Sequence, residues 1–451
     1  MRSRSRAFHF LPAPERRRRI LSLALPIIGG MLSQNVLNLV DTAMVGSLGD
    51  TALAAVGLGS FANFTAMAFV TGMSAAVQAM AARWLGEGRA HETAQPLNGG
   101  LLLAVAIAVP WSALLFWLAP RLFPFLDDDP GVIAAGIPYW QARLVGMVAV
   151  GMNFAFRGYW NAVNLSRLYL GTLIVMHVVN ISLNWVLIFG HLGAPPLGAT
   201  GAGVASAIAT YVGCACYFVL GVRHARGAGF LSGLPSGSTM ATMLRLAIPA
   251  GLQQLFFAAG MTAFFWILAK LGTSELAAAN VLINLVLVAV LPAIGFGLAA
   301  ASLVGQSLGA HAAADARRWG WEVARLASLT VAVLVTPALL APDLILGIFL
   351  HDPDTLALAR MPLQIAAVGV VIDAFGLVLL NAHLGAGNSR HVMVVATALQ
   401  WGLFLPLSYL VGPILGYGLL AVWAANMGYR LVQTCVFSLT WRGEAWARIK
   451  A

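Results

Sequence analysis

The residues of this sequence that could carry chemistry are a few acids and amides inside long apolar runs. The first run, Ile20 to Gly46, holds one carboxylate, Asp41, together with Gln34 and Asn38. The three are spaced four and three residues apart, so a helix places them on one face. An acid within a membrane helix costs roughly 2.5–3.5 kcal/mol on insertion scales and is usually kept for ion or substrate handling. Because burial favours the protonated carboxyl, Asp41 is a candidate proton carrier.

Two further features accompany this acid. Pro26, in the same run, removes a backbone donor and is a candidate hinge. In the run 168–190, His177, Asn180 and Asn184 fall at i, i+3 and i+7, again on one face. The plain interpretation of this face is interhelical hydrogen bonding, which contributes about 0.6 kcal/mol per bond. We expect His177 to be packed between helices, with a proton relay as the alternative.

The second half of the chain offers a smaller set. Asp373 lies near the middle of the run 358–384 and is a second candidate for ion coupling, against the alternative of a structural acid. Asn280 and Asn284 are four residues apart in the run 275–305 and either line a cavity or join helices.

These side chains must be positioned by membrane helices. The chain has 451 residues, of which 60% are hydrophobic and 9% charged. Such a composition predicts an all-α polytopic membrane protein. We expect twelve spans, at about 20–46, 51–81, 95–119, 133–158, 168–190, 200–222, 243–269, 275–305, 319–341, 358–384, 391–411 and 418–440.

The charges predict the orientation of the chain. The net charge is +10, but the arginines cluster at the ends of the spans, which favours positive-inside topology over a nucleic-acid partner. On this reasoning both termini are cytoplasmic. The inner connections carry Arg83, Arg89, Arg167, Arg223, Arg226, Arg317, Arg318 and Arg390, and the outer ones carry Asp127, Asp128, Asp129, Asp343, Asp352 and Asp354.

An internal repeat divides the chain into halves. A shift of 223 residues places the LALP motif at Leu23 on LAIP at Leu246, and Asp129-Pro130 on Asp352-Pro353. Six spans in each half predict two parallel repeats around a central cleft. The predicted divisions are a basic tail 1–19, a lobe 20–222, a linker 223–242, a lobe 243–442 and a tail 443–451. Asp41 and Asp373 have no acidic counterpart in the other half, so they are asymmetric additions to the scaffold.

Several classes of function are disfavoured by the composition. Neither of the two lysines, Lys270 and Lys450, follows a glycine, so the sequence has no Walker A loop. The three cysteines lie in apolar runs and predict neither a disulfide framework nor a metal site. No segment outside the spans is large enough for a catalytic domain, so we expect no enzyme and no cofactor.

The sequence resembles the prokaryotic branch of the multidrug and toxic compound extrusion (MATE) family over nearly its whole length. The resemblance is carried by short motifs in order: VDTAMVGSLG at Val40, Arg157-Gly158 with the downstream Arg167, VVNISLNWVLIFG at Val178, GAGVASAI at Gly201, LVGQSLGA at Leu303 and HLGAGNSR at His383. It implies a V-shaped cleft between two six-helix lobes in the bacterial inner membrane. It also implies secondary active export of bulky, often cationic drugs against an inward flow of protons or sodium. We expect a monomer.

The resemblance also ranks the candidate residues. The family places a coupling acid where this chain has Asp41, and a polar pair facing it where this chain has Asn180 and Asn184. Sodium-coupled members add a glutamate in the seventh span to an acid like Asp373, and this chain has no such glutamate at Leu252–Gly260. We therefore expect protons as the coupling ion, with sodium as the alternative.

Two competing functions remain at this point. One is a flippase for lipid-linked oligosaccharides, whose diphosphate would need arginines at mid-depth; the sequence places its arginines near the interfaces. The other is a scaffold for ion sensing or assembly, which would leave the paired repeats without a use.

Overall fold

The computed structural model describes residues 11–350 and 352–449, and this part of the chain is helical with short turns. The predicted tail residues 1–10 lie outside it. The helices are α1 (Pro14–Gly46), α2 (Asp50–Ala68), α3 (Gly72–Gly86), α4 (Gln95–Leu122), α5 (Pro130–Val145), α6 (Met147–Ala162), α7 (Ser166–Phe189), α8 (Gly198–His224), α9 (Gly237–Ala269), α10 (Thr273–Gly309), α11 (Ala313–Leu340), α12 (Pro342–Leu346), α13 (Pro353–Gly385), α14 (Ser389–Leu399), α15 (Leu405–Tyr409) and α16 (Gly418–Arg442). Short 3-10 or π-helical turns are η1 (Phe123–Phe125), η2 (His191–Gly193), η3 (Arg226–Ala228), η4 (Gln400–Phe404), η5 (Leu410–Ile414) and η6 (Ala445–Arg448).

The helices match the twelve predicted spans. Within the described residues, ten segments are long and apolar enough to cross a membrane, and the bent pair α5 and α6 makes an eleventh. The twelfth is α16, which has 25 residues and carries Arg430 near its middle. The fold is therefore the expected all-α bundle of twelve membrane helices.

Three of the predicted continuous spans are interrupted. The span 51–81 is broken between α2 and α3, and 133–158 bends by 46° at Gly146, between α5 and α6. The span 391–411 contains the π-helical turn η4, and a second such turn, η5, begins at its end. Hydropathy reports length and polarity only, so it does not detect such breaks.

The repeat is visible in the helix bounds. α1 and α9 begin and end 223 residues apart, and α13 spans the same register as α5 and α6 together. Asp129 and Asp352, which the repeat aligns, both act as N-caps: Asp129 Oδ1 accepts from Gly131 N at 2.7 Å, and Asp352 Oδ2 accepts from Thr355 N at 3.0 Å. The hydrogen bonds from Thr355 also lower the pKa of Asp352, which keeps this cap ionised.

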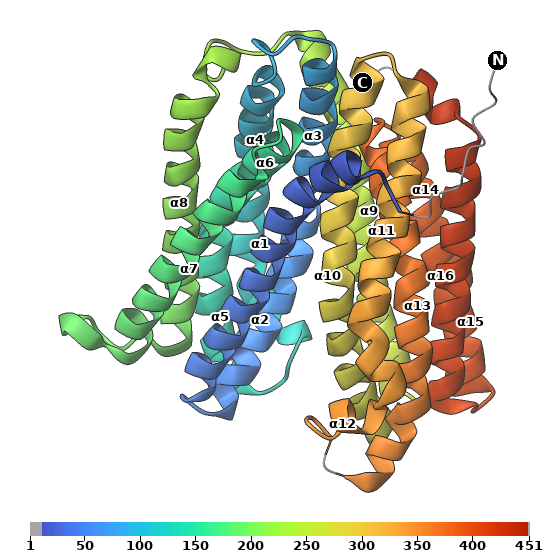
Figure 1. Ribbon diagram of the computed structural model, residues 1–451. Helices are drawn as coiled ribbons and strands as arrows, with labels where there is room; N and C mark the ends of the chain where they lie inside the picture. The colour runs from blue at the N-terminus through green and yellow to red at the C-terminus, as the bar shows by residue number, and fades with distance from the viewer. Residues whose placement is uncertain (1–10, 351, 450–451) are drawn as a thin grey trace.

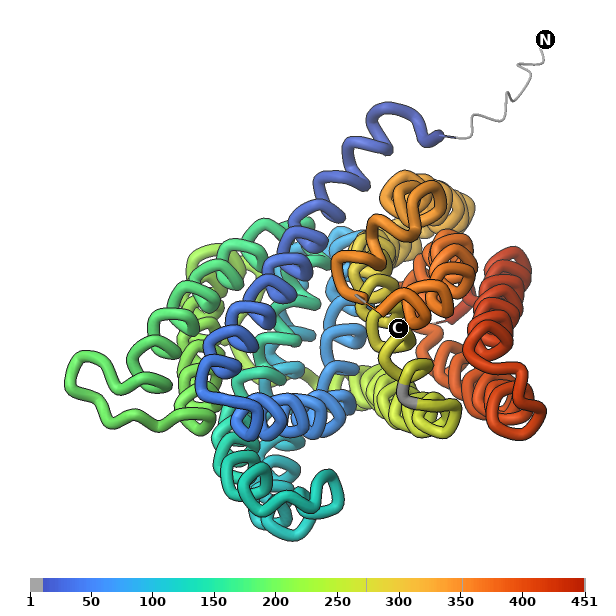
Figure 2. Tube along the Cα trace, turned by 90° about the horizontal axis from the view of Figure 1, so that it is seen from below, coloured from blue at the N-terminus to red at the C-terminus, as the bar shows by residue number. Residues whose placement is uncertain are grey.

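The two repeats form two groups of helices, the N-lobe (α1–α8) and the C-lobe (α9–α16), seen side by side in Figure 2. They meet near the end of the molecule where α1 begins and α16 ends, here called the terminal face, and diverge toward the opposite, far face (Figure 1). At the terminal face, Gly86 of α3 packs on the Gln306 carbonyl and Gly309 of α10 packs on the Arg83 carbonyl, with no room for a Cβ at either glycine. The repeat relates these two contacts to each other, so a pseudo-two-fold axis runs between α3 and α10.

Helix α1 packs in both lobes. Near its start, Ile20 and Leu23 belong to a core cluster with α10, α11 and α13. Arg16 holds Asp315 at 2.6 Å and also pairs with Glu322, both in α11. Farther along, α1 contacts α7 of the N-lobe. The start of α1 therefore lies against the C-lobe beside α11, as Figure 2 shows.

Both predicted tails are partly built into the fold. In the predicted tail 1–19, residues 14–19 already belong to α1, and Arg16 and Arg19 contact α11 and α10 of the C-lobe. In the tail 443–451, Trp446 is buried and stacks on Trp441 with ring centroids 3.8 Å apart. A large aromatic side chain gains stability by packing against another aromatic ring, so Trp446 is buried although it lies in the predicted tail.

Candidate transport site

Asp41, Asn180 and Asn184, which the sequence predicts as one site, form one cluster. Asn184 Nδ2 donates to Asp41 Oδ1 at 2.6 Å across α1 and α7. Asn180, with its amide oriented to accept from Ser206 Oγ at 3.1 Å, donates to Asp41 at 2.9 Å. Both asparagines are buried, and Asp41 is partly exposed. The positive charge of Arg143 in α5 also acts on the carboxyl.

The amides determine what this cluster can bind. They present N–H groups to Asp41, and a carboxylate accepts such bonds when ionised. Asn184 Oδ1 is buried without a hydrogen-bond partner in the described part of the chain. Because an amide carries both a donor and an acceptor, a flip of the Asn184 amide group would let its Oδ1 accept a hydrogen bond from a protonated Asp41. The cluster thus suits a carboxyl that changes its protonation state.

The other polar residues of α1 and α7 lie beside this cluster. His177 is buried, and its Nε2 lies 3.1 Å from Ser33 Oγ, which ties α7 to α1. Gln34 Nε2 donates to Asn38 Oδ1 at 3.2 Å, and both side chains are exposed. The structure thus places His177 as a helix–helix contact rather than in hydrogen-bond contact with Asp41.

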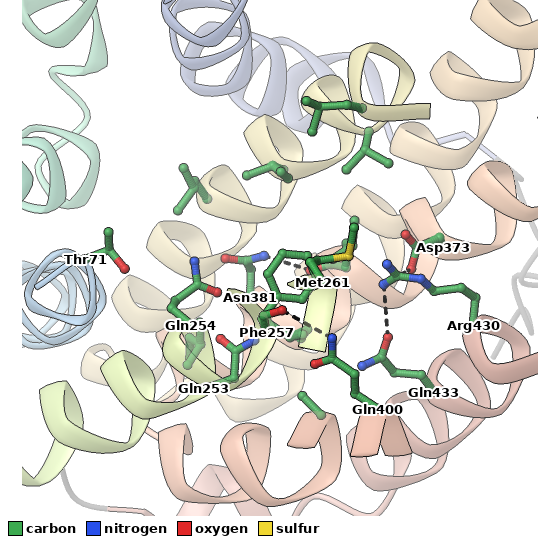
Figure 3. Close-up of a pocket in the computed structure, with 18 of the residues that line it drawn as sticks. Thr71, Gln253, Gln254, Phe257, Met261, Asp373, Asn381, Gln400, Arg430 and Gln433 are labelled. Atoms are coloured by element: carbon green, nitrogen blue, oxygen red, sulfur yellow. Dashed lines mark hydrogen bonds and ion pairs between the residues drawn. The ribbon is translucent and has the colours of Figure 1, made fainter. Parts of the chain in front are cut away.

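A separate cavity of about 550 Å³ lies between the lobes. Its wall includes Gln78 of α3, whose Nε2 donates to the Leu298 carbonyl at 2.7 Å and to Ser302 Oγ at 2.9 Å in α10. Amides from α9, α13, α16 and the turn η4 also reach it, among them Gln253, Gln254, Asn381 and Gln400 (Figure 3). Gln400 stands in the π-helical turn η4, and such turns frequently occur at functional sites.

Asp373 lines this cavity and is held by a partner that the sequence prediction missed. Arg430 Nη1 of α16 lies 3.3 Å from Asp373 Oδ1 and 3.5 Å from Gln433 Oε1 (Figure 3). The position where a sodium ion would contact Asp373 is therefore next to a guanidinium. The sequence contained a signal for this residue, because a charge in the middle of a span is a functional candidate by default.

The prediction that all arginines lie near the membrane interfaces is wrong. Arg157 of α6 and Arg430 both line the cavity. Arg157 Nε donates to Ser74 Oγ at 3.3 Å, and its guanidinium lies 4.3 Å from the centre of the Phe154 ring. The bend between α5 and α6 precedes Arg157, and hydropathy alone had placed this residue at the end of a span.

The predicted cavity residues do not line this cavity. Asn280 and Asn284 are exposed on α10, and each donates to a carbonyl of its own helix, at 3.1 and 2.9 Å. Gln34, Asn38 and His177 are likewise absent from its wall. Helical spacing shows which residues share a face, but the direction of that face depends on how the helix packs. Pro26 is buried inside the continuous helix α1.

Twelve membrane helices in two parallel repeats around a mainly apolar central cavity have the architecture of a polytopic membrane transporter, not of an enzyme. A family model described as MatE matches residues 26–186 and 249–410, one match in each repeat. The chain therefore belongs to the MATE family, as the sequence motifs predict.

Individual relatives agree with this assignment. The chain is 29% identical over 417 residues to the multidrug resistance protein NorM of Burkholderia vietnamiensis, covering 89% of this chain and 88% of that protein. It is 25% identical over 451 residues to a probable NorM of Thermotoga maritima, covering 97% and 96%. Among solved structures, a MOP superfamily transporter from Pyrococcus furiosus superposes with a TM-score of 0.87 at 18% identity, covering 99% of this chain and 100% of that one. A MATE family transporter in an outward-facing conformation also gives 0.87 at 18% identity, covering 96% and 97%.

Proposed function

We propose that this protein is a secondary antiporter that exports drug-like organic compounds in exchange for protons, with Asp41 carrying the coupling proton. The relatives named as multidrug resistance proteins support export of drugs. The observation that carries the proposal is the cluster around Asp41, a partly exposed carboxyl held by two buried amides outside the central cavity. The coupling ion and the exported compound thus have separate sites.

The geometry around Asp41 favours protons over sodium. A sodium ion requires several oxygen ligands, whereas the asparagines direct N–H groups at the carboxyl. The charge of Arg143 also opposes a second cation. Asp373 is also a poor sodium ligand, because Arg430 already neutralises its negative charge.

The packing of α1 could couple the protonation of Asp41 to the shape of the central cavity. The same helix carries Asp41 beside α7 and is fixed at its start to α10 and α11 of the C-lobe. Protonating Asp41 weakens the charge-assisted hydrogen bond from Asn184. A bend at Pro26 would then move α1 relative to the C-lobe and change the width of the cavity.

We further propose that the terminal face is cytoplasmic, because the connections there are basic and those at the far face are acidic. The monomer would lie in a bacterial inner membrane with its cavity sealed from the cytoplasm. Cysteines introduced at Asp128 or Asp352 should then react with an impermeant thiol reagent on intact cells. Reaction that occurs only after lysis would reverse the topology.

The coupling ion is tested in proteoliposomes with one gradient imposed at a time. We expect a proton gradient to drive movement of a transported dye, and a sodium gradient at equal pH to drive none. The physical reason is that the groups around Asp41 suit a carboxyl that gains and loses a proton, and they do not offer the several oxygen ligands that sodium needs. Transport driven by sodium alone, and insensitive to the proton gradient, would overturn the assignment.

A lipid-linked oligosaccharide flippase stays a second candidate, because two arginines line the cavity. One of them is neutralised by Asp373, which leaves a single guanidinium for a diphosphate. For this reason we rank the flippase below the drug antiporter.

A further inference from the structure

We propose that the central cavity binds organic anions: amphipathic compounds with an acidic group that pairs with Arg157 and an apolar body that packs in the C-lobe. This inference rests on the proposed export function and names the class of compound that the cavity accepts. It departs from the cationic drugs that the family resemblance implies.

The first argument is the balance of charge. The described residues that line the cavity include three charged side chains: Arg157, Asp373 and Arg430. Asp373 and Arg430 form an ion pair and cancel each other. The remaining formal charge is that of Arg157, so the cavity is positive. An organic cation would meet like charge there and no uncompensated carboxylate, because Asp41 lies outside the cavity wall.

The second argument is the surroundings of Arg157. Of the ion pairs found in the described chain, none includes this residue. Its neighbours are neutral: the Ser74 hydroxyl, the Phe154 ring and the phenol of Tyr169. A guanidinium away from bulk water without a counter-charge is costly, and a carboxylate, sulfonate or phosphate that forms paired hydrogen bonds relieves that cost.

The third argument is the rest of the wall, which suits the body of such a compound. Across the cavity from the N-lobe, the C-lobe contributes a set of aromatic and methionine side chains: Phe257, Met261, Phe264, Trp423, Met427 and Tyr429. Aromatic groups and flexible thioethers pack against varied apolar shapes. A volume of about 550 Å³ is in the range of sites for drug-sized ligands. The compound would thus span both lobes.

The acidic group can come from two sources, a drug-like acid or the diphosphate of a lipid carrier. Both would bind through Arg157, so the experiment must include both. The probes are 1-pyrenebutyrate, its cationic analogue 1-pyrenebutyltrimethylammonium, and a long-chain prenyl diphosphate as a competitor. The two pyrene probes share their aromatic body and differ in the sign of the charge.

Binding and proton-driven transport are measured with the full-length protein in lipid vesicles. We expect the wild-type protein to bind and transport the pyrene anion in preference to the pyrene cation. In Arg157→Gln, anion binding should weaken about tenfold or more, because a hydrogen bond to a charged group is lost together with the charge attraction. Arg157→Lys should recover part of the binding. Arg223→Gln, the same change at an exposed position at the end of α8, should leave it unchanged.

The outcomes separate this inference from the proposed function. Preference for the cation in the wild-type protein overturns the inference and leaves drug export intact, and this readout does not depend on a variant that folds. Anion binding that is unaffected by Arg157→Gln also overturns it. Competition by the prenyl diphosphate, with neither pyrene probe transported, supports an anion site at Arg157 and rejects drug export.

Discussion

Asp41→Asn is expected to reduce proton-driven export to the rate of vesicles without protein. The amide that replaces the carboxyl cannot bind or release a proton, so the exchange loses its coupling ion. The protein should still fold, because an asparagine at this position can hydrogen-bond to Asn184 and removes a partly buried charge. Transport in vesicles with an imposed proton gradient measures the loss, and substrate binding without a gradient should persist.

The matched control is Asp50→Asn, the same chemical change at an exposed acid in the first turn of α2. It should export at the wild-type rate. Asp41→Glu keeps a titratable group and should retain part of the activity. If Asp41→Asn exports like the wild-type protein at equal expression, another residue carries the coupling ion.

Asp373→Asn is expected to lower the thermal stability of the protein more than it lowers coupling. The change leaves the Arg430 guanidinium without its partner, and breaking a buried ion pair costs about 3–5 kcal/mol. We expect roughly 3 kcal/mol, the lower end of that range, because the Arg430 side chain keeps 22% of its surface exposed. Melting of the detergent-solubilised protein measures the loss.

The reverse change and the double change complete this test. Arg430→Gln should destabilise less than Asp373→Asn, because an isolated carboxyl can bind a proton and become neutral whereas a guanidinium stays charged. The double variant Asp373→Asn/Arg430→Gln should recover most of the stability. If Asp373→Asn abolishes export while the protein melts normally, Asp373 is a coupling site and not the partner of a structural pair.

The sequence by itself determined the class of protein, the order of its helices and the first candidate site. The apolar runs are long enough to span a bilayer. Because a segment inside a bilayer must satisfy its backbone hydrogen bonds internally, each run is expected to form a helix. The shift of 223 residues predicted that α1 and α9 share one register, as they do. The association of Asp41 with Asn184 followed from helical spacing and the family motifs.

Only the tertiary structure decided which polar side chains meet inside the protein. Asp373 and Arg430 are 57 residues apart on α13 and α16, and no local pattern links them. Helical spacing shows which residues share a face, but the direction of each face is set by how the helices pack. That packing turned Asn280 and Asn284 away from the cavity wall and brought Arg157 into it. The charge of the cavity, and with it the class of compound we propose, is therefore a property of the assembled bundle.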